Sequence, residues 1–248
     1  MLELAGVGKV YSSINGEKIE AVDNLSLVIV ENELVCLVGR SGCGKTTTLR
    51  LIAGLETPTR GRILLSGKKV EGPSAERCVV FQRYTLFPWR SVLANVAFGL
   101  EMQGVSRAER EKTALDYLAL VGLEDQARAY PVELSGGMQQ RVAVARALAT
   151  DPQVLLMDEP FGALDAQTRA VLQQELMRIW RVDRKTIVFV THDIQEAVLL
   201  ADRVVVMQGP PGHIREIIDC DLPRPRDRNS AAFMDMSDRI HLLLEGAE

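Results

Sequence analysis

The sequence has no long apolar run and no leader-like start. No stretch approaches the roughly 18 consecutive apolar residues that span a bilayer. The opening MLELAGVGKVYSS lacks the apolar core of a signal peptide. We therefore expect a chain that stays in the cytoplasm.

Closely spaced cysteine pairs are also missing. Cys36, Cys43, Cys78 and Cys220 are widely spaced and form no CxxC pair, so the sequence indicates neither a zinc site nor a disulfide framework. We expect four free thiols.

An excess of positive charge is missing as well. The 29 Lys and Arg residues stand against 33 Asp and Glu, a net charge of -4, whereas proteins that bind a nucleic-acid backbone usually present a strongly basic surface. We expect no nucleic-acid partner. With 47% hydrophobic and 25% charged residues over 248 positions, the composition excludes wholesale disorder or a fibrous repeat and suits one large domain.

Three short apolar runs predict buried parallel strands. They are LVCLV at 34–38, VLLM at 154–157 and IVFV at 187–190. Polar or glycine-rich residues follow each run directly, and ligands bind at the carboxyl ends of strands in an open α/β sheet. The polar residues that follow all three runs should therefore lie at one edge of the sheet. Helices are expected after them at 46–53, 167–181 and 194–201.

The rest of the chain divides into a β-rich start, a helical insertion and a tail. Residues 2–30, with a turn-like NGEK, and the strand candidate ILLSGKKV at 63–70 predict a small antiparallel layer. Val92, Val96 and Leu100 indicate a helical subdomain, inserted at about 91–150. The segment LPRPRDRNS ends the main part, and a short amphipathic helix follows within a tail at about 222–248, where its apolar stripe packs against its own domain. The apolar positions of that stripe are Phe233, Met236, Ile240 and Leu243.

The most specific motif is GRSGCGKT at residues 39–46, between a predicted strand and a predicted helix. It fits GxxxxGK[ST], in which glycines let backbone N–H groups curl around a phosphate at a helix N-terminus. Lys45 would reach the β- and γ-phosphates, and the Thr46 hydroxyl would bind Mg²⁺. Alone, this motif indicates an NTPase or a kinase.

Two adjacent carboxylates follow the second strand run. Asp158 would hold Mg²⁺ through water, while Glu159 would polarise the attacking water as general base. An apolar run followed by two acids is by itself an ordinary strand end, and its place downstream of a phosphate loop favours catalysis.

A second candidate anion site lies at LSGGMQQ, residues 134–140. Small residues precede a helical run to Leu148, so Ser135 and the glycines would form another helix start that receives an anion. A lone SGG is more often a flexible turn.

Taken together, these segments resemble the ABC ATPase family over essentially the whole chain. Its Walker A, signature, Walker B, D-loop and switch-histidine motifs are matched by GRSGCGKT, LSGGMQQ, VLLMDEP, GALD and THD. The resemblance implies an α/β fold: a P-loop NTPase core with a mixed or parallel sheet, an N-terminal antiparallel β subdomain and an inserted helical subdomain, in a single domain over 1–248. It implies ATP and Mg²⁺ as ligands.

The resemblance also implies residue roles. Tyr11 would stack on adenine, Gln82 would sense Mg²⁺ and the γ-phosphate, Asp165 would lie at a dimer seam and His192 would contact the γ-phosphate. The residues expected to bind ATP are Tyr11, Gly39, Arg40, Ser41, Gly42, Cys43, Gly44, Lys45, Thr46 and Thr47. Those expected to take part in catalysis are Lys45, Gln82, Glu159 and His192. Those expected to bind Mg²⁺ are Thr46, Gln82 and Asp158.

Some of these positions have simpler interpretations. Tyr11 could be an ordinary strand aromatic, and His192 could be a neutral capping histidine. Met138 departs from the commonest form of the signature, where many relatives have glutamine, and we expect little effect from it.

In the family, the signature of one subunit faces the phosphate loop of another. Ser135, Gly136, Gly137 and Gln139 are therefore expected to contact ATP across a homodimer, or a pair with a paralogous ATPase. ATP binding would close the pair and hydrolysis would reopen it. The membrane partners implied are integral permease subunits and, indirectly, a solute-binding protein, which places the chain at the cytoplasmic face of the cell membrane.

Phe87, Pro88 and Trp89 precede the helical subdomain and could receive a coupling helix of the permease; the alternative is that they belong to the subdomain core. FPWRSV, DEPFGALDA and LPRPRDR look most like the ATPases of nitrate, sulfonate and taurine importers. Exporter or lipid-transport ATPases remain the nearest alternative. ABC-type ATPases that act on nucleic acid carry coiled-coil insertions, zinc modules or fused cassettes, which the sequence lacks.

Overall fold

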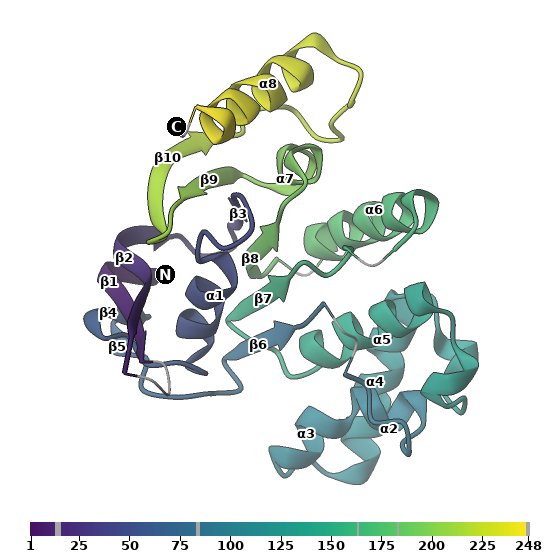
Figure 1. Cartoon of the computed structure of the whole chain (residues 1–248). Coiled ribbons are helices and arrows are strands. Elements are labelled where there is room, and N and C mark those ends of the chain that lie inside the picture. Colours follow the sequence, from purple (N-terminus) through teal and green to yellow (C-terminus); the bar gives the residue numbers. More distant parts are fainter. Residues whose placement is uncertain (13–15, 83–84, 163, 183, 247–248) are drawn as a thin grey trace. The chain divides into compact units, whose positions relative to one another are not determined.

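The computed structural model describes residues 1–12, 16–82, 85–162, 164–182 and 184–246. These form two compact units, the first made of Met1–Ser74 with Thr186–Glu248 and the second of Ala75–Lys185 (Figure 1). Small parts of predicted segments lie outside the described residues: Asn15 of the NGEK turn, residues 83–84 after Gln82, Ala163 of GALD and residues 247–248 of the tail.

The first unit contains a four-stranded antiparallel sheet. Its strand order is β2-β1-β4-β5, which confirms the predicted antiparallel layer. The bounds are β1 (Leu2–Ser12), β2 (Lys18–Ile29), β4 (Arg60–Leu65) and β5 (Lys68–Lys69). The prediction of one strand over 63–70 is wrong, because Ser66 and Gly67 take φ values of 50° and 78° and turn the chain back as a hairpin.

The same unit contains four further strands in the order β10-β9-β3-β8. Their bounds are β3 (Leu34–Val38), β8 (Thr186–Thr191), β9 (Arg203–Gln208) and β10 (His213–Asp219). Strand β3 runs parallel to β8 and β9, whereas β10 is antiparallel to β9. Every residue of β3 and β8 is buried, as the continuous apolar runs predicted.

Among the described residues of the first unit, the helices are α1 (Lys45–Ala53), α7 (Ile194–Leu200) and α8 (Ala231–Glu245). Helix α8 packs against α7 and β9, and it buries Phe233 and Ile240. The predicted amphipathic helix is thus present, with its stripe turned toward its own unit.

The second unit pairs β6 (Arg77–Val80) in parallel with β7 (Val154–Asp158). Its helices are α2 (Val92–Val96), α3 (Phe98–Met102), α4 (Arg107–Leu120), α5 (Gly136–Leu148) and α6 (Ala166–Val182), with short turns η1 (Glu124–Gln126) and η2 (Pro131–Glu133).

The predicted stripe of Val92, Val96 and Leu100 is buried but extends over two helices. Ala97, between α2 and α3, has ψ at -12°, far from the roughly -42° of a regular α-helix. Within the parts of the chain that the structure describes, no helix combines the length and apolarity needed to cross a bilayer.

Candidate nucleotide-binding site

The loop after β3 has the geometry of a phosphate cradle. Gly42 and Gly44 have φ values of 84° and 87°, a left-handed conformation that glycine adopts without strain. Gly44 begins α1, and its carbonyl accepts the first helical hydrogen bond from the Thr48 amide at 2.8 Å. Backbone N–H groups at such a helix start attract anions, so the loop could hold a phosphate group.

Close packing behind the loop requires glycine at Gly39. A Cβ atom added there would lie 2.4 Å from Sγ of Cys43 and 2.6 Å from the Met207 carbonyl oxygen on β9. Gly212 also packs closely against this loop, since a Cβ atom added there would lie 2.2 Å from the Cys43 carbonyl oxygen. Sequence reasoning missed Met207 and Gly212 because neither belongs to the motif, and only the fold brings them to it.

Lys45 lies inside the curve of the loop. Its side chain is buried, and Nζ donates to the carbonyl oxygens of Gly39 at 2.7 Å and Arg40 at 3.0 Å. Arg40, Ser41 and Gly42 are exposed. A buried ammonium under an exposed, glycine-containing rim is an arrangement that could receive a phosphate group.

The first turn of α1 presents two hydroxyl side chains. Thr46 and Thr47 are half-buried, directly after Lys45. The hydroxyl of Thr46 is an oxygen donor of the type that Mg²⁺ prefers, so Thr46 could hold this ion beside the loop.

Strand register places His192 at the phosphate loop. In the parallel pair of β3 and β8, Val38 lies opposite Thr191, so the residues that follow them, Gly39 and His192, leave the sheet at the same edge. His192 is exposed. The capping residue of α7 is Asp193, whose Oδ1 accepts from the Glu196 amide at 3.1 Å, so the interpretation of His192 as the cap is wrong.

Tyr11 lies near the end of β1 and pairs with Ile19 on β2. Two residues further along β2, the Ala21 carbonyl would lie 2.8 Å from a Cβ added at Gly44. The ring is half-exposed, with Nζ of Lys9 at 4.9 Å from its centroid. Tyr11 is thus on the stretch of β-structure that borders the phosphate loop.

In the second unit, Glu159 and Gln82 come together where two neighbouring strands end. Val80 lies opposite Met157 in the parallel pair of β6 and β7, so Gln82 and Glu159 follow neighbouring strand ends. A Cβ added at Gly162 would lie 3.5 Å from Nε2 of Gln82 and 3.6 Å from Oε2 of Glu159. The two side chains therefore flank the same glycine.

Glu159 has an uncommon backbone conformation. Its φ is 45°, in the left-handed region that side-chain-bearing residues rarely adopt. The Glu159 carbonyl accepts from the Gly162 amide at 3.1 Å, which closes a turn directly after Asp158 at the end of β7. Such conformations cluster at functional sites.

The signature segment begins helix α5, as predicted. Ser135 is the capping residue, and its Oγ accepts from the Met138 amide at 3.3 Å. Nε2 of Gln139 donates to the carbonyls of Pro131 at 3.0 Å and Leu134 at 3.2 Å, so this amide also orders the loop before the helix.

The start of α5 lies against the start of α6. A Cβ added at Gly137 would lie 2.7 Å from Cγ2 of Thr168, and an open pocket of about 260 Å³ lies between the two helices.

Asp165 caps α6, with Oδ1 accepting from the amides of Gln167 at 3.1 Å and Thr168 at 3.0 Å. Hydrogen bonds from the Thr168 backbone, and then its side chain, lower the pKa of Asp165. Asp165 thus stays ionised at this surface.

Comparison with known proteins agrees with the motifs. A family described as ABC transporter matches residues 22–162. The chain is 48% identical to the nitrate import ATP-binding protein of a Synechocystis species, covering 100% of this chain and 96% of that protein. It is also 48% identical to the taurine import ATP-binding protein of Pseudomonas syringae pv. tomato, covering 96% and 90%.

A solved structure has the same fold. It is a dimeric ATP-binding cassette in a post-hydrolysis state, bound to ADP and Pi. The TM-score is 0.77 at 35% identity, with 90% of this chain and 100% of that chain covered.

Proposed function

The chain belongs to the ABC transporter family as an ATP-binding, ATP-hydrolysing subunit, and from this premise we propose that it drives import of a small anion such as nitrate, taurine or another sulfonate. The observation that supports nucleotide use most directly is the loop around Lys45, with its two left-handed glycines. The proposed solute class is supported by the two import relatives at 48% identity. We assign the whole chain to one cassette domain, with the helical subdomain at about 91–150 and the tail at about 222–248.

ATP would be held by the phosphate loop and hydrolysed with the help of Glu159. Lys45 neutralises phosphate charge, Glu159 takes the proton of the attacking water and His192 contacts the γ-phosphate. Tyr11 supports the adenine ring by stacking.

Mg²⁺ is the metal that the donor set suits. The Thr46 hydroxyl, the Gln82 amide oxygen and the Asp158 carboxylate, the last acting through water, are hard oxygen donors. The ion would supply charge neutralisation at the phosphates, and these side chains would orient it.

Two copies of the chain, or one copy and a paralogous ATPase, would enclose the nucleotide. Ser135, Gly136, Gly137 and Gln139 would contact the ATP of the partner. The start of α5, with its Ser135 cap, supports this because it offers N–H groups to an anion.

The permease would dock at the loop that carries Trp89. This side chain is 73% exposed, so the alternative, that Trp89 belongs to the subdomain core, is wrong. Phe87 is half-buried and packs on Phe98 with ring centroids 4.6 Å apart. An exposed aromatic on a supported loop suits an anchor for a partner helix. Docking to permease subunits, which receive solute from a binding protein, would hold the chain at the cytoplasmic face of the membrane.

The experiment that tests this function is reconstitution with the permease and its binding protein. ATPase activity should be stimulated by one of a panel of oxyanions and sulfonates, and transport should follow the same solute. Stimulation only by lipids, or transport out of the compartment that holds the binding protein, would contradict the import of a small anion.

A further inference from the structure

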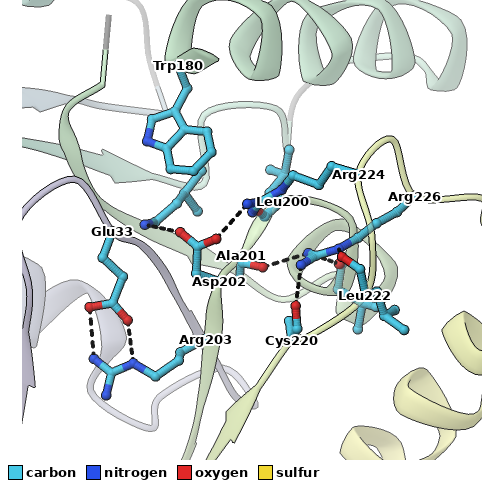
Figure 2. A network of polar contacts seen from close by, with 12 residues as sticks. Glu33, Trp180, Leu200, Ala201, Asp202, Arg203, Cys220, Leu222, Arg224 and Arg226 are labelled. Atoms are coloured by element: carbon cyan, nitrogen blue, oxygen red, sulfur yellow. Dashed lines mark hydrogen bonds and ion pairs between the residues drawn. The ribbon is translucent and has the colours of Figure 1, made fainter.

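The segment that follows β10 binds the end of helix α7 (Figure 2). Arg226 donates from Nη1 to the carbonyls of Val198 and Ala201, both at 2.6 Å, and from Nε to that of Leu222 at 3.2 Å. Its Nη2 donates to the carbonyl of Cys220. One guanidinium thus binds four backbone carbonyls, two of them at the end of α7.

Arg224 completes this arrangement. Its Nη2 donates to the Leu200 carbonyl, and its Nη1 pairs with the Asp202 carboxylate. Burial, and then the charge of Arg224, lower the pKa of Arg226, so placing two cations together has an electrostatic cost. The acceptors that offset it are the last carbonyls of α7, which carry partial negative charge and have no partner within the helix.

Asp202 extends the contacts to the strand of the phosphate loop. Its Oδ2 accepts from the Leu34 amide at 2.9 Å, and its own amide donates to the Leu34 carbonyl at 2.7 Å. Leu34 is the first residue of β3, whose other end continues into the loop. The tail segment, α7 and β3 are therefore fastened at one point.

The opposite end of α7 begins beside His192. Asp193 caps the helix, and His192 precedes it directly. Seven residues make a helix about 10 Å long, so a displacement of its last carbonyls should also displace the residues before its first turn.

We propose that Arg224 and Arg226, the arginine clasp, are positioning residues for ATP hydrolysis that hold α7 and thereby set the place of His192. The proposal rests on the function proposed for His192. A purely structural clasp would anchor the tail and affect stability alone.

Arg226→Lys is the central variant, because lysine keeps the charge but lacks the planar fork that reaches several carbonyls. Arg215→Met is the matched control. Arg215 also donates to the tail, at the Gly246 carbonyl at 3.3 Å, but this hydrogen bond does not involve α7. The measurements are kcat and KM for ATP, and amide hydrogen exchange along the full chain.

Arg226→Lys should lower kcat about tenfold, because small displacements of a catalytic group are costly, while KM changes less than about twofold. Exchange over residues 193–200 should be at least about tenfold faster, since charge-assisted hydrogen bonds are lost. Arg215→Met should change neither.

The double variant with His192→Ala separates positioning from general destabilisation. Because the clasp acts through His192, Arg226→Lys should lower kcat no further in that background. An equal further loss overturns the proposal, as does unchanged exchange over residues 193–200 in Arg226→Lys. If His192→Ala keeps the wild-type kcat, the proposed role of His192 is wrong, while faster exchange in Arg226→Lys would still show that the clasp holds α7.

Discussion

Asn95 and Phe87 bind each other through both polar groups of the asparagine side chain. Oδ1 of Asn95 accepts from the Phe87 amide at 2.8 Å, and Nδ2 donates to the Phe87 carbonyl at 3.1 Å. Nδ2 also reaches the carbonyls of Arg90 and Ser91, each at 3.0 Å. A fully buried side chain on α2 thus shapes the loop on which Trp89 is exposed.

Replacing this side chain should destabilise the protein. Asn95→Leu keeps the size but removes all four hydrogen bonds, and the Phe87 amide and the Arg90 carbonyl lose the partner that Asn95 gives them. We therefore expect a loss of about 3 kcal/mol in the free energy of unfolding, measured by denaturant titration. Asn229→Leu is the control, since Asn229 is exposed and the change should stay within about 0.5 kcal/mol. Equal losses for both variants would show that the Asn95 hydrogen bonds are not what stabilises the loop.

The sequence predicted three of the strands beside the site, β3, β7 and β8, and the helices that follow them, for a physical reason. Runs such as LVCLV are apolar at every position because both faces of β3 are covered, and Ser135 before a helical run is a local capping signal. Asn95 carries no such signal. It stands in an apolar stripe, and its four hydrogen bonds depend on how the preceding loop returns to α2.

The phosphate loop should not tolerate a methyl group at Gly39. Its Cβ would meet the Met207 carbonyl oxygen, a backbone atom, at 2.6 Å, so Gly39→Ala must distort the loop and should weaken ATP binding about tenfold or more. Isothermal titration with ATP measures the effect.

Gly72→Ala is the matched control for Gly39→Ala. A Cβ at Gly72 has no heavy atom within 4 Å and its backbone needs no left-handed φ, so ATP affinity should stay at the wild-type value. Wild-type affinity in Gly39→Ala would contradict the close packing of the loop against β9.

Trp89→Ala should separate ATP hydrolysis from transport. The side chain is 73% exposed and has no proposed role in binding or hydrolysing ATP, so the isolated chain should keep its ATPase rate. In the reconstituted transporter, solute uptake per ATP should fall severalfold, because an interface anchor is lost. Val132, also exposed on the second unit, gives the control Val132→Ala. Unchanged uptake in Trp89→Ala rejects the docking site.

Cys220 should make stability decrease at alkaline pH. The four cysteines, all within the described chain, are free thiols, and burial raises the pKa of Cys220 from the ordinary 9.0 to about 11. Between these values the unfolded chain has released the thiol proton and the folded chain has not. The thiol's contribution to stability is therefore complete below about pH 9 and is lost as pH rises toward 11.

The size of this effect follows from the proton difference. The free energy of unfolding should fall by roughly 1.4 kcal/mol per pH unit across that window, and Cys220→Ala should remove this part of the slope. Denaturant titrations at several pH values compare the two proteins. Identical slopes would show that Cys220 does not titrate differently on folding.

The tail makes contacts that sequence patterns do not predict. LPRPRDRNS has the composition of a boundary, and charge alone predicts a solvated segment. In the structure, Arg226 binds carbonyls of Val198 and Ala201, which lie 28 and 25 positions away in sequence. Composition cannot indicate such partners, because backbone carbonyls are present at every residue and only the folded path of the chain selects among them.

The most direct test of the account is the mass of the Glu159→Gln variant in Mg-ATP, measured by light scattering after gel filtration. The change removes the proposed base but leaves Lys45 and the glycines of the loop intact, so ATP should remain bound and unhydrolysed. We expect a stable dimer that retains ATP, which dissociates when Lys45→Ala is added. In our account, ATP bound at the phosphate loop closes the dimer, and hydrolysis, with Glu159 as the base, reopens it. A monomer without nucleotide, or ATP turnover near the wild-type rate, would contradict this claim.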